Sequence, residues 1–376
     1  MAPLTKAQRK QALAAEESFH RTYAAQYGDE RWQQSLYPAL VAPTRYSVHV
    51  NGFAVSGVPK AVLEEAERLR LIDIPRNEKS SSDTHSGGLV SYQWSTPEIE
   101  EPFPPPQADR AGGLMTHWNL DAASLLAVSV LGPKPGDKVL DLCAAPGGKS
   151  VALAQLLRPE DFDEACPSLG GGCLHSNEVN HARNKRLSSN LQSYLPALLF
   201  RGDEVRVLKF DGADVNAVQN LPLGPGGYDK VLLDAPCSSE RHIIHAHAKA
   251  KQGGRVADEV ATWRSGHPKK MAKTQAALLM TALRAVRVGG NILYATCSLS
   301  SDENDGVVDK VIELVQKERK KLRVRWGLTV LSGALAEEGL DQWAEPTKHG
   351  WIVLPDHQGG GKWGPLFFAL IGKTPA

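Results

Sequence analysis

From residue 113 to the end of the chain, short apolar runs bounded by Gly, Pro or Asp alternate with segments whose apolar residues recur at helical spacing. In residues 270–287, for example, Leu278 and Ala282 share one helical face while Arg284 lies on the other. Near-continuous apolar strands separated by helices are typical of a mostly parallel sheet covered on both faces, so we predict an α/β fold. The predicted strands cover residues 138–142, 172–176, 204–210, 228–234, 291–296 and 366–371, and we expect the last to lie at the edge of the sheet.

The N-terminal part of the chain shows a helical pattern instead. Leu13, Phe19 and Tyr23 are spaced for one helical face, and Pro38 and Pro43 interrupt the pattern, so residues 1–40 are expected to form one or two helices. A further helix is expected over residues 59–71, which begin with a proline at a plausible first-turn position.

Two linker-like stretches follow. Residues 77–88 are rich in Ser, Asp and Gly, and residues 97–106 contain five prolines. Neither composition can carry a regular ladder of hydrogen bonds. We therefore place a boundary near residue 112, between a mainly helical N-terminal region (1–112) and an α/β domain (113–376).

Composition narrows the class of protein. At roughly 150 residues per domain, 376 residues suggest about two globular units, and 42% hydrophobic content excludes a mostly disordered chain. No run of 18 apolar residues occurs, which excludes a membrane span. Five cysteines without a signal peptide do not resemble a secreted disulfide framework, so a reducing compartment is expected. Basic residues near the start suit a mitochondrial presequence, but Glu16 and Glu17 oppose that interpretation.

The most informative segment is VLDLCAAPGGKS, residues 139–150. A strand, a glycine turn and a helix N-terminus form a polar crevice where open α/β sheets bind nucleotide-like ligands. We expect Gly147 and Gly148 to let the backbone approach the ligand without a Cβ in the way. A dinucleotide loop needs G-x-G-x-x-G, which is absent, and a phosphate-binding P-loop would need glycine in place of Cys143. The remaining common occupant of this turn is S-adenosylmethionine, and no metal is expected.

Acidic residues follow the next strands. Glu178 comes after the second strand, where an acid accepts ribose hydroxyls in nucleotide folds, and Asp211-Gly212 follows the third, where it would hold an adenine amino group. Either acid alone is more often a solvated loop carboxylate. Their occurrence in register on successive strand ends favours the ligand-binding interpretation.

Two cysteines end neighbouring strands. Asp234-Ala-Pro-Cys237 follows the fourth strand and Thr296-Cys297 follows the fifth, so a parallel sheet brings both thiols to the edge that carries the glycine turn. A lone cysteine is usually a buried structural residue, which is our interpretation of Cys143, Cys166 and Cys173. For a pair at neighbouring strand ends a catalytic role is the better explanation.

Thiols at a methyl-donor site suit one reaction in particular. Carbon 5 of cytosine becomes nucleophilic only after a thiolate adds to carbon 6. Positive charge from a sulfonium or from Lys149 would lower the pKa of that thiol. Asp234, if it faces the base, would hydrogen-bond the exocyclic amine or the protonated ring nitrogen and stabilise the adduct. The second thiol, or a water that it positions, would remove the carbon 5 proton.

Three segments, residues 119–150, 231–242 and 293–304, together resemble the Nop/Sun family of RNA cytosine-5 methyltransferases. The resemblance covers about residues 113–376 and implies a Rossmann-like S-adenosylmethionine-dependent methyltransferase sheet with helices on both faces. It implies that Cys297 is the nucleophile, that Cys237 assists product release, and that Lys149 and Asp234 contact the target cytosine. It also implies a cofactor site formed by Gly147, Gly148, Lys149, Ser150, Glu178, Arg183, Asp211, Gly212 and Asp234. Glu178 departs from the family pattern, in which Asp is frequent.

Residues 19–54 are similar to the mitochondrial members of the family that modify small-subunit ribosomal RNA or a tRNA anticodon. That similarity implies a mitochondrial location and hints at a helical protein partner that delivers the RNA. No segment resembles the RNA-binding module appended to several tRNA-modifying relatives. Two alternatives stay open: a methyltransferase acting on an amine or a protein, which typically carries an N/D-P-P-aromatic turn, and a ribosome-assembly factor that keeps the fold without catalysis.

The charge balance of 43 basic against 42 acidic residues argues at first against a polyanionic partner. Residues 241–290, however, hold ten Lys or Arg and two acids, a net charge of +8, so the rest of the chain sums to −7. This segment follows the Pro-Cys motif, and we expect it to bind an RNA backbone beside the site, although a solvated helix face is the plainer interpretation. A second basic run, residues 317–325, would extend that surface or merely cap a helix.

Overall fold

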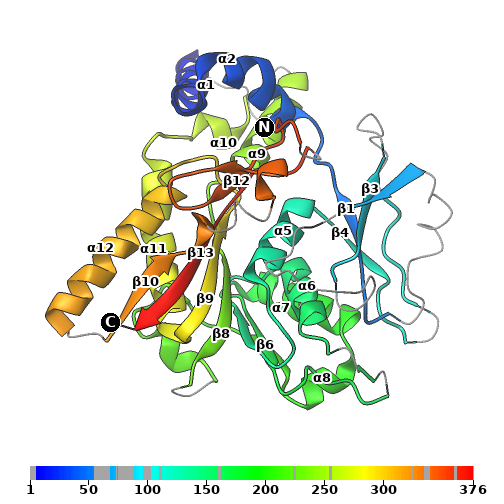
Figure 1. The fold of residues 1–376 in the computed structure, drawn as a ribbon. Helices are drawn as coiled ribbons and strands as arrows, with labels where there is room; N and C mark the ends of the chain where they lie inside the picture. Colours follow the sequence, from blue (N-terminus) through cyan, green and yellow to red (C-terminus); the bar gives the residue numbers. More distant parts are fainter. Residues whose placement is uncertain are drawn as a thin grey trace.

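The structure, a computed structural model, describes residues 6–54, 68–72, 74, 88–95, 103–109, 112–159, 162–163, 165–222, 226–253, 256–322, 325–333, 339–359 and 362–375. Its main element is a nine-stranded sheet in the order β11-β12-β13-β9-β8-β5-β6-β7, with β10 paired to β13 (Figure 1). The strands are β5 (Lys138–Asp141), β6 (Cys173–Asn177), β7 (Val205–Leu208), β8 (Tyr228–Asp234), β9 (Val286–Thr296), β10 (Trp326–Val330), β11 (Glu345–Pro346), β12 (Trp351–Val353) and β13 (Leu366–Pro375).

The predicted α/β fold is confirmed. Strands β5 to β9 pair in parallel in the order β7-β6-β5-β8-β9, and all six predicted strands are present. The expected edge position of β13 is wrong, because β13 pairs antiparallel with β9, β10 and β12. Residues 326–353 supply three short strands that extend the sheet beyond it, and their apolar runs are too short to stand out in the sequence.

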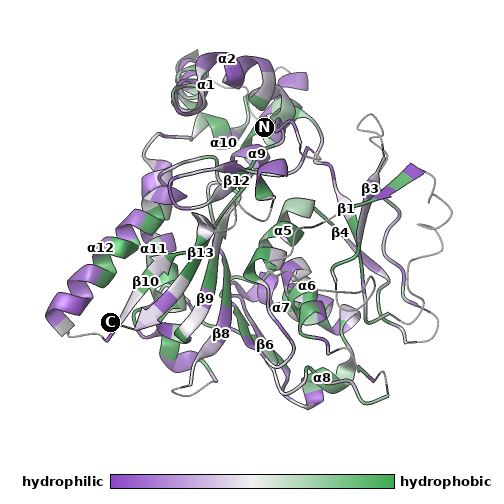
Figure 2. Ribbon diagram, in the orientation of Figure 1, coloured by the Kyte–Doolittle hydropathy of each residue, from purple (hydrophilic) through white to green (hydrophobic). Residues whose placement is uncertain are grey.

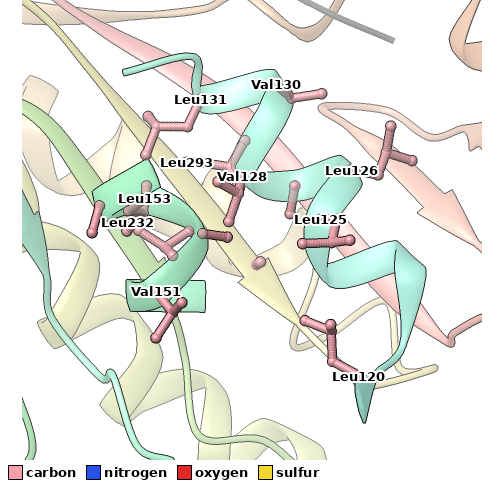
Figure 3. Close-up of a cluster of buried hydrophobic side chains, with 14 of the residues drawn as sticks. Leu120, Leu125, Leu126, Val128, Val130, Leu131, Val151, Leu153, Leu232 and Leu293 are labelled. Carbon is pink, nitrogen blue, oxygen red and sulfur yellow. The ribbon is translucent and has the colours of Figure 1, made fainter. Parts of the chain in front are cut away.

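Helices cover both faces of this sheet, as predicted. The alternation of side chains along each strand divides the core in two: Leu232 and Leu293 point into one hydrophobic cluster, and Val231 and Ile292 into the other. Figure 3 shows the first cluster, where leucines and valines of α5 and α6 pack on Leu232 and Leu293. The helices of the domain are α5 (Ala122–Leu131), α6 (Gly148–Leu156), α7 (His181–Tyr194), α8 (Ala197–Arg201), α9 (Glu240–Gln252), α10 (Asp258–Ala261), α11 (His267–Ala285) and α12 (Asp305–Leu322), with 3-10 turns at Ala217–Asn220 and Leu340–Gln342.

Hydropathy follows this layering. In Figure 2 the central strands β8, β9 and β13 are mainly hydrophobic, whereas α12 alternates between hydrophilic and hydrophobic residues. Apolar residues fill the central positions of β8 and β9, which are buried on both faces of the sheet. No helix in the described ranges is both long and apolar enough to cross a membrane.

The N-terminal helices pack into the second hydrophobic cluster. They are α1 (Lys6–Tyr27), α2 (Asp29–Arg31), a π-helical turn (Trp32–Leu36) and α3 (Tyr37–Val41). Phe19 and Tyr23 are buried as expected, but Leu13 is 59% exposed, because Ala12 and Ala15 occupy the inner face instead. Pro38 does not end the helical region, since it lies in the first turn of α3, where no backbone N–H is needed.

A second sheet, which the sequence pattern did not predict, follows these helices. It has four antiparallel strands in the order β2-β3-β1-β4: β1 (Ser47–Val50), β2 (Leu69–Leu71), β3 (Ser91–Trp94) and β4 (His117–Leu120). Strand β4 lies beyond residue 112 and pairs with β1, so backbone hydrogen bonds cross the proposed domain boundary. Most of the helix expected over residues 59–71 lies outside the described residues, and its last three residues form β2.

Candidate active site

The two cysteines at the strand ends lie in contact. Asp234 of β8 is in register with Ala295 of β9, so the segments after both strands leave the sheet at the same edge. The Cys237 and Cys297 sulfur atoms are 3.0 Å apart, and both thiols are partly accessible. Ser239 Oγ lies 3.1 Å from Cys297 Sγ and 3.5 Å from Cys237 Sγ. The two thiols therefore lie together at one edge of the sheet, where the sequence predicted them.

Hydrogen bonding makes the two thiols unequal. The hydrogen bond from Cys237 lowers the pKa of the Cys297 thiol, burial opposes this, and the Ser239 hydroxyl lowers the pKa further. The same Cys237–Cys297 contact, together with burial, raises the pKa of Cys237. Cys297 is thus the thiol of the pair that ionises more readily, with Cys237 as its hydrogen-bond donor. The neighbouring thiol, rather than Lys149, is the largest cause of this activation.

An ion pair lies at the same sheet edge. Lys149 Nζ donates to Asp234 Oδ2 at 2.7 Å. Burial acts to lower the pKa of Lys149, but attraction to Asp234 outweighs it, so the pKa is raised and the ammonium stays charged. The Cys297 thiolate also favours the charged form of Lys149. The pair therefore presents a fixed cation and a hydrogen-bond acceptor beside the thiols.

A cavity of about 110 Å³ opens beside this ion pair. Asp141, at the end of β5, is the buried carboxylate in its wall: Oδ2 accepts a hydrogen bond from Ser150 Oγ at 2.7 Å, while Oδ1 is buried without a well-formed partner in the described part of the chain. Burial raises the pKa of Asp141 to about 7. The lining residues are Trp118, Leu120, Ser124, Asp141, Cys143, Ala144, Ala145, Pro146, Gly148, Lys149 and Asp234.

Packing of protein side chains also constrains the two glycines of the turn. Gly147 has φ +116°, which side chains rarely adopt, and an added Cβ would meet a Leu187 methyl at 3.2 Å. A Cβ on Gly148 would lie 3.1 Å from the Trp118 indole nitrogen. The absence of a Cβ on both glycines therefore leaves room for these neighbouring side chains. Gly148 also lines the cavity.

The remaining predicted cofactor residues lie around the cavity rather than in its wall. Glu178 is buried, accepts a hydrogen bond from Asn180 N at 2.8 Å and pairs with Arg183 at 3.3 Å. Asp211 is exposed and accepts a hydrogen bond from Ala213 N at 2.9 Å. Gly212 is packed so closely that a Cβ would meet Leu278 at 2.9 Å. All of them follow strands β6 and β7 at the edge that carries the cavity.

Two buried carboxylates that the sequence interpretation missed hold the cysteine segments. Glu303 accepts hydrogen bonds from the backbone N–H and hydroxyl of Ser238 and from Gln275. Glu240 accepts from Leu299 N at 2.9 Å, and the Ser298 hydroxyl lies 3.1 Å from both carboxylates. Burial raises the pKa of Glu240 to about 7. In the sequence, the signal for these two carboxylates is that both follow a cysteine motif within a few residues.

The other cysteines differ in their surroundings. Cys173 is buried, as expected for a structural residue, and Cys143 is partly accessible in the cavity wall. Cys166 is exposed, so the expectation of burial is wrong for it. It lies in the connection between α6 and β6, where few elements cover the chain.

The described part of the basic segment, residues 241–290, consists mainly of α9, α10 and α11, and only part of its charge is available. Arg241 is buried and donates to backbone carbonyls, while Lys251, Arg284 and Arg287 pair with acids. The exposed charges without an acidic partner in the described ranges include Lys249, Lys269, Lys270 and Lys273. The last three lie in the first half of α11, which contacts the Cys237 segment through a hydrogen bond from Gln275 to Pro236 O at 2.9 Å.

The second basic run caps a helix far from the cysteines. Arg319, Lys320 and Lys321 form the last turn of α12, where cations interact favourably with the helix dipole. Glu318 pairs with Arg284 near the end of α11, at the start of β9. The run therefore lies at the sheet edge opposite Cys297 and does not extend the basic surface.

One sheet edge carries a thiol of lowered pKa, its donor thiol, an ammonium–carboxylate pair and a cavity. In the described residues, one oxygen of the buried carboxylate in the cavity wall lacks a well-formed hydrogen bond. A thiolate beside a fixed cation can add to an electron-poor ring and form a covalent intermediate. The cavity can hold a small ligand with a cationic group next to that ring.

Known proteins are similar to this chain in sequence and in fold. Residues 128–326 match the family described as 16S rRNA methyltransferase RsmB/F. The chain is 32% identical over 321 residues to the 5-cytosine rRNA methyltransferase NSUN4 of Bos taurus, a match that covers 80% of this chain and 74% of the relative. It is 32% identical over 367 residues to the mitochondrial tRNA (cytosine(34)-C(5))-methyltransferase of Mus musculus, covering 95% of this chain and 89% of the relative. A solved methyltransferase homologue from Pyrococcus horikoshii has a TM-score of 0.59 and 19% identity, covering 99% of this chain and all of that one, which supports the fold alone.

Proposed function

The chain belongs to the Nop/Sun (RsmB/F) family of RNA cytosine-5 methyltransferases, and from this premise we propose that Cys297 is the nucleophile that adds to carbon 6 of the target cytosine. The enzyme transfers a methyl group to carbon 5 of cytosine in RNA. Family membership decides against the amine-directed methyltransferase and the non-catalytic assembly factor. The observation that carries the proposal is the 3.0 Å contact in which the Cys237 thiol lowers the pKa of Cys297.

The cavity suits the methyl donor of such an enzyme. Its wall combines apolar side chains with a few polar groups, Asp141 and the Lys149–Asp234 pair, as small-molecule sites do. Asp141 Oδ1, buried without a well-formed partner, would accept a hydrogen bond from the ammonium group of S-adenosylmethionine. Gly148 and the N-terminus of α6 would lie against the same end of the ligand, and Glu178 with Arg183, Asp211 and Gly212 would bind the ribose and adenine. The bound donor supplies an electrophilic methyl group.

The residues of this chain would act in sequence on the base. The Cys297 thiolate would form the bond to carbon 6, which would make the electron pair of the 5,6 double bond available at carbon 5. Carbon 5 would then bond to the methyl group as the methyl–sulfur bond of the donor breaks, with that bond's electron pair left on the sulfur. Asp234, oriented by Lys149 at 2.7 Å, would accept a hydrogen bond from the exocyclic amine or from the protonated ring nitrogen and stabilise the adduct. Lys149 keeps positive charge beside the thiolate throughout.

Product release would depend on Cys237. After methylation, the carbon 5 proton must leave, the 5,6 double bond must reform, and the sulfur–carbon 6 bond must break. Removal of the proton needs a base, and a water positioned by the Cys237 sulfur can supply it. The Cys237 thiol then donates a hydrogen bond to the departing Cys297 thiolate, as it does in the free enzyme.

RNA would approach over the first half of α11. Lys269, Lys270 and Lys273 are exposed there, and this part of the helix contacts the Cys237 segment. Such a short basic strip would hold the phosphate backbone while one cytosine leaves its stack and enters the site. This arrangement fits a chain with a net charge of only +1.

We also propose that the substrate is a ribosomal or transfer RNA and that the protein is mitochondrial. The support is the naming of its relatives: an rRNA methyltransferase in Bos taurus and a mitochondrial tRNA methyltransferase in Mus musculus. A helical partner that delivers the RNA remains part of the proposal. Methylation of naked RNA at full rate by the purified chain alone would remove the need for such a partner.

The direct experiment compares wild-type protein with Cys297→Ala in methyl transfer to mitochondrial and cytosolic RNA, read by bisulfite sequencing. We expect Cys297→Ala to lose 5-methylcytosine formation while S-adenosylmethionine binding stays within about twofold of wild type. Cys166→Ala is the matched control, because this exposed thiol lies outside the site and its loss should change nothing. Persistent 5-methylcytosine formation by Cys297→Ala contradicts the proposal.

A further inference from the structure

The segment that follows Cys297 is held by the N-terminal helix α1. Leu299, two residues after the thiol, is fully buried. Its carbonyl oxygen accepts two hydrogen bonds from α1, from Gln26 Nε2 at 2.6 Å and from the Tyr27 hydroxyl at 2.8 Å. These contacts join parts of the chain more than 270 residues apart, so no local pattern in the sequence indicates them.

The remaining polar groups of this segment are held in the same way. Gln26 Oε1 accepts a hydrogen bond from Ser301 N at 3.2 Å, so one carboxamide bridges Leu299 and Ser301. Leu299 N donates to Glu240 Oε2 at 2.9 Å, and Tyr23 donates its hydroxyl to Glu240 Oε1 at 2.6 Å. Both backbone groups of Leu299 are therefore held by α1, directly or through Glu240.

Helix α1 is itself firmly anchored to the domain. Phe19 packs edge-on against the buried Trp263 with ring centroids 5.3 Å apart, and Tyr23 lies 5.6 Å from the ring of Trp32. Beyond the helix, Arg31 donates to Asp356 at 2.9 Å and also pairs with Glu345. A helix tied down at this many points can hold a neighbouring loop in one position.

We propose that Gln26, Tyr27 and Tyr23 are positioning residues for Cys297, which makes α1 a structural part of the active site rather than a separate N-terminal region. A helix needed only to fill the core would bury apolar side chains, whereas here three polar side chains converge, directly or through Glu240, on the backbone of Leu299, two residues after the thiol. By fixing Leu299, they keep Cys297 within hydrogen-bonding distance of Cys237 and Ser239. The inference rests on the proposed role of Cys297 and extends it to α1.

The first test measures single-turnover methyl transfer at saturating RNA and S-adenosylmethionine for Gln26→Ala, Gln26→Glu and Tyr27→Phe. Loss of the hydrogen bonds to Leu299 should lower the rate about tenfold in Gln26→Ala, with the KM for RNA unchanged. Gln26→Glu should be slower still, because a carboxylate oxygen would face the Leu299 carbonyl. Tyr27→Phe keeps the ring packing and removes only the hydroxyl. Gln11→Ala, an exposed glutamine on the same helix, is the matched control and should keep the wild-type rate.

The second test needs no RNA. Alkylation of Cys297 by iodoacetamide, followed by peptide mapping across pH, should shift toward higher pH in the Gln26 variants, because the displaced thiol loses its hydrogen bonds. An unchanged alkylation profile together with an unchanged single-turnover rate overturns the proposal. A raised KM for RNA with an unchanged alkylation profile also overturns it, since α1 would then act on RNA binding. If wild-type protein forms no 5-methylcytosine but the profile shifts as expected, the proposed function fails while the positioning role stands.

Discussion

Replacing Cys237 with alanine should raise the pKa of Cys297. In the structure Cys237 Sγ lies 3.0 Å from Cys297 Sγ, and its hydrogen bond is the largest cause of the lowered pKa of that thiol. A hydrogen bond to a charged group contributes about 1.5–3 kcal/mol, and a thiol is a weak donor, so we take the lower end. That energy corresponds to a rise of about one pKa unit, because one unit equals about 1.4 kcal/mol. Ser239, 3.1 Å away, would keep part of the effect.

The assay for this shift is the pH dependence of Cys297 alkylation, with the modified peptide quantified by mass spectrometry. Well below the pKa, the alkylation rate of Cys237→Ala should be about tenfold lower than that of wild type, since only the thiolate reacts. Cys237→Ser keeps a hydroxyl donor and is the control, with a smaller shift. A Cys297 profile that stays unchanged or moves to lower pH in Cys237→Ala would refute the idea that the two thiols are coupled in this way.

Three further predictions test other parts of the site. Burial raises the pKa of Asp141 to about 7, so its carboxylate is available to the ammonium group of the donor mainly above pH 7. The affinity for S-adenosylmethionine, measured by calorimetry, should therefore rise between pH 6 and 8, and this pH dependence should nearly disappear in Asp141→Asn. An unchanged pH dependence in that variant would remove Asp141 from the site. Gly212→Ala places a Cβ 2.9 Å from Leu278 and should lower the free energy of unfolding, measured by urea titration, by about 1–3 kcal/mol. Gly266→Ala is the control, because the space around Gly266 is open, and it should hardly change the free energy of unfolding. The triple variant Lys269→Ala, Lys270→Ala, Lys273→Ala should weaken RNA binding and reduce the salt dependence of that binding. Alanine at Lys317, Lys320 and Lys321 is the control and should leave RNA binding unchanged. Equal losses of binding in both variants would contradict a localised RNA surface.

The chemistry of the site was predictable because it depends on where strands end. Apolar runs identify β5, β8 and β9, and the polar residues that follow them, such as Asp234 and Cys297, must meet at one edge of a parallel sheet. Gly147 and Gly148 were predicted to matter for ligand approach, but their second constraint was not predictable, because it depends on Trp118 of β4 and Leu187 of α7 packing over them. Such packing appears only once distant segments are folded together.

Long-range pairings account for the other differences between sequence and structure. The pairing of β1 with β4 joins residues about 70 positions apart, and four-residue strands leave too short an alternation to be recognised. The contacts of Gln26 and Tyr27 with Leu299 are equally remote in sequence. The charge excess of residues 241–290 was real, but composition could not reveal that Arg284 and Arg287 are neutralised by acids elsewhere in the fold.

The most direct measurement of the central claim is the identity of the residue that carries the RNA. Cys237→Ala protein incubated with substrate RNA and S-adenosylmethionine should accumulate a covalent adduct, because product release is slowed. After nuclease and protease digestion, tandem mass spectrometry should find the methylated cytidine on Cys297. Attachment to any other residue, or methylation of the RNA in the Cys297→Ala variant, would contradict the account.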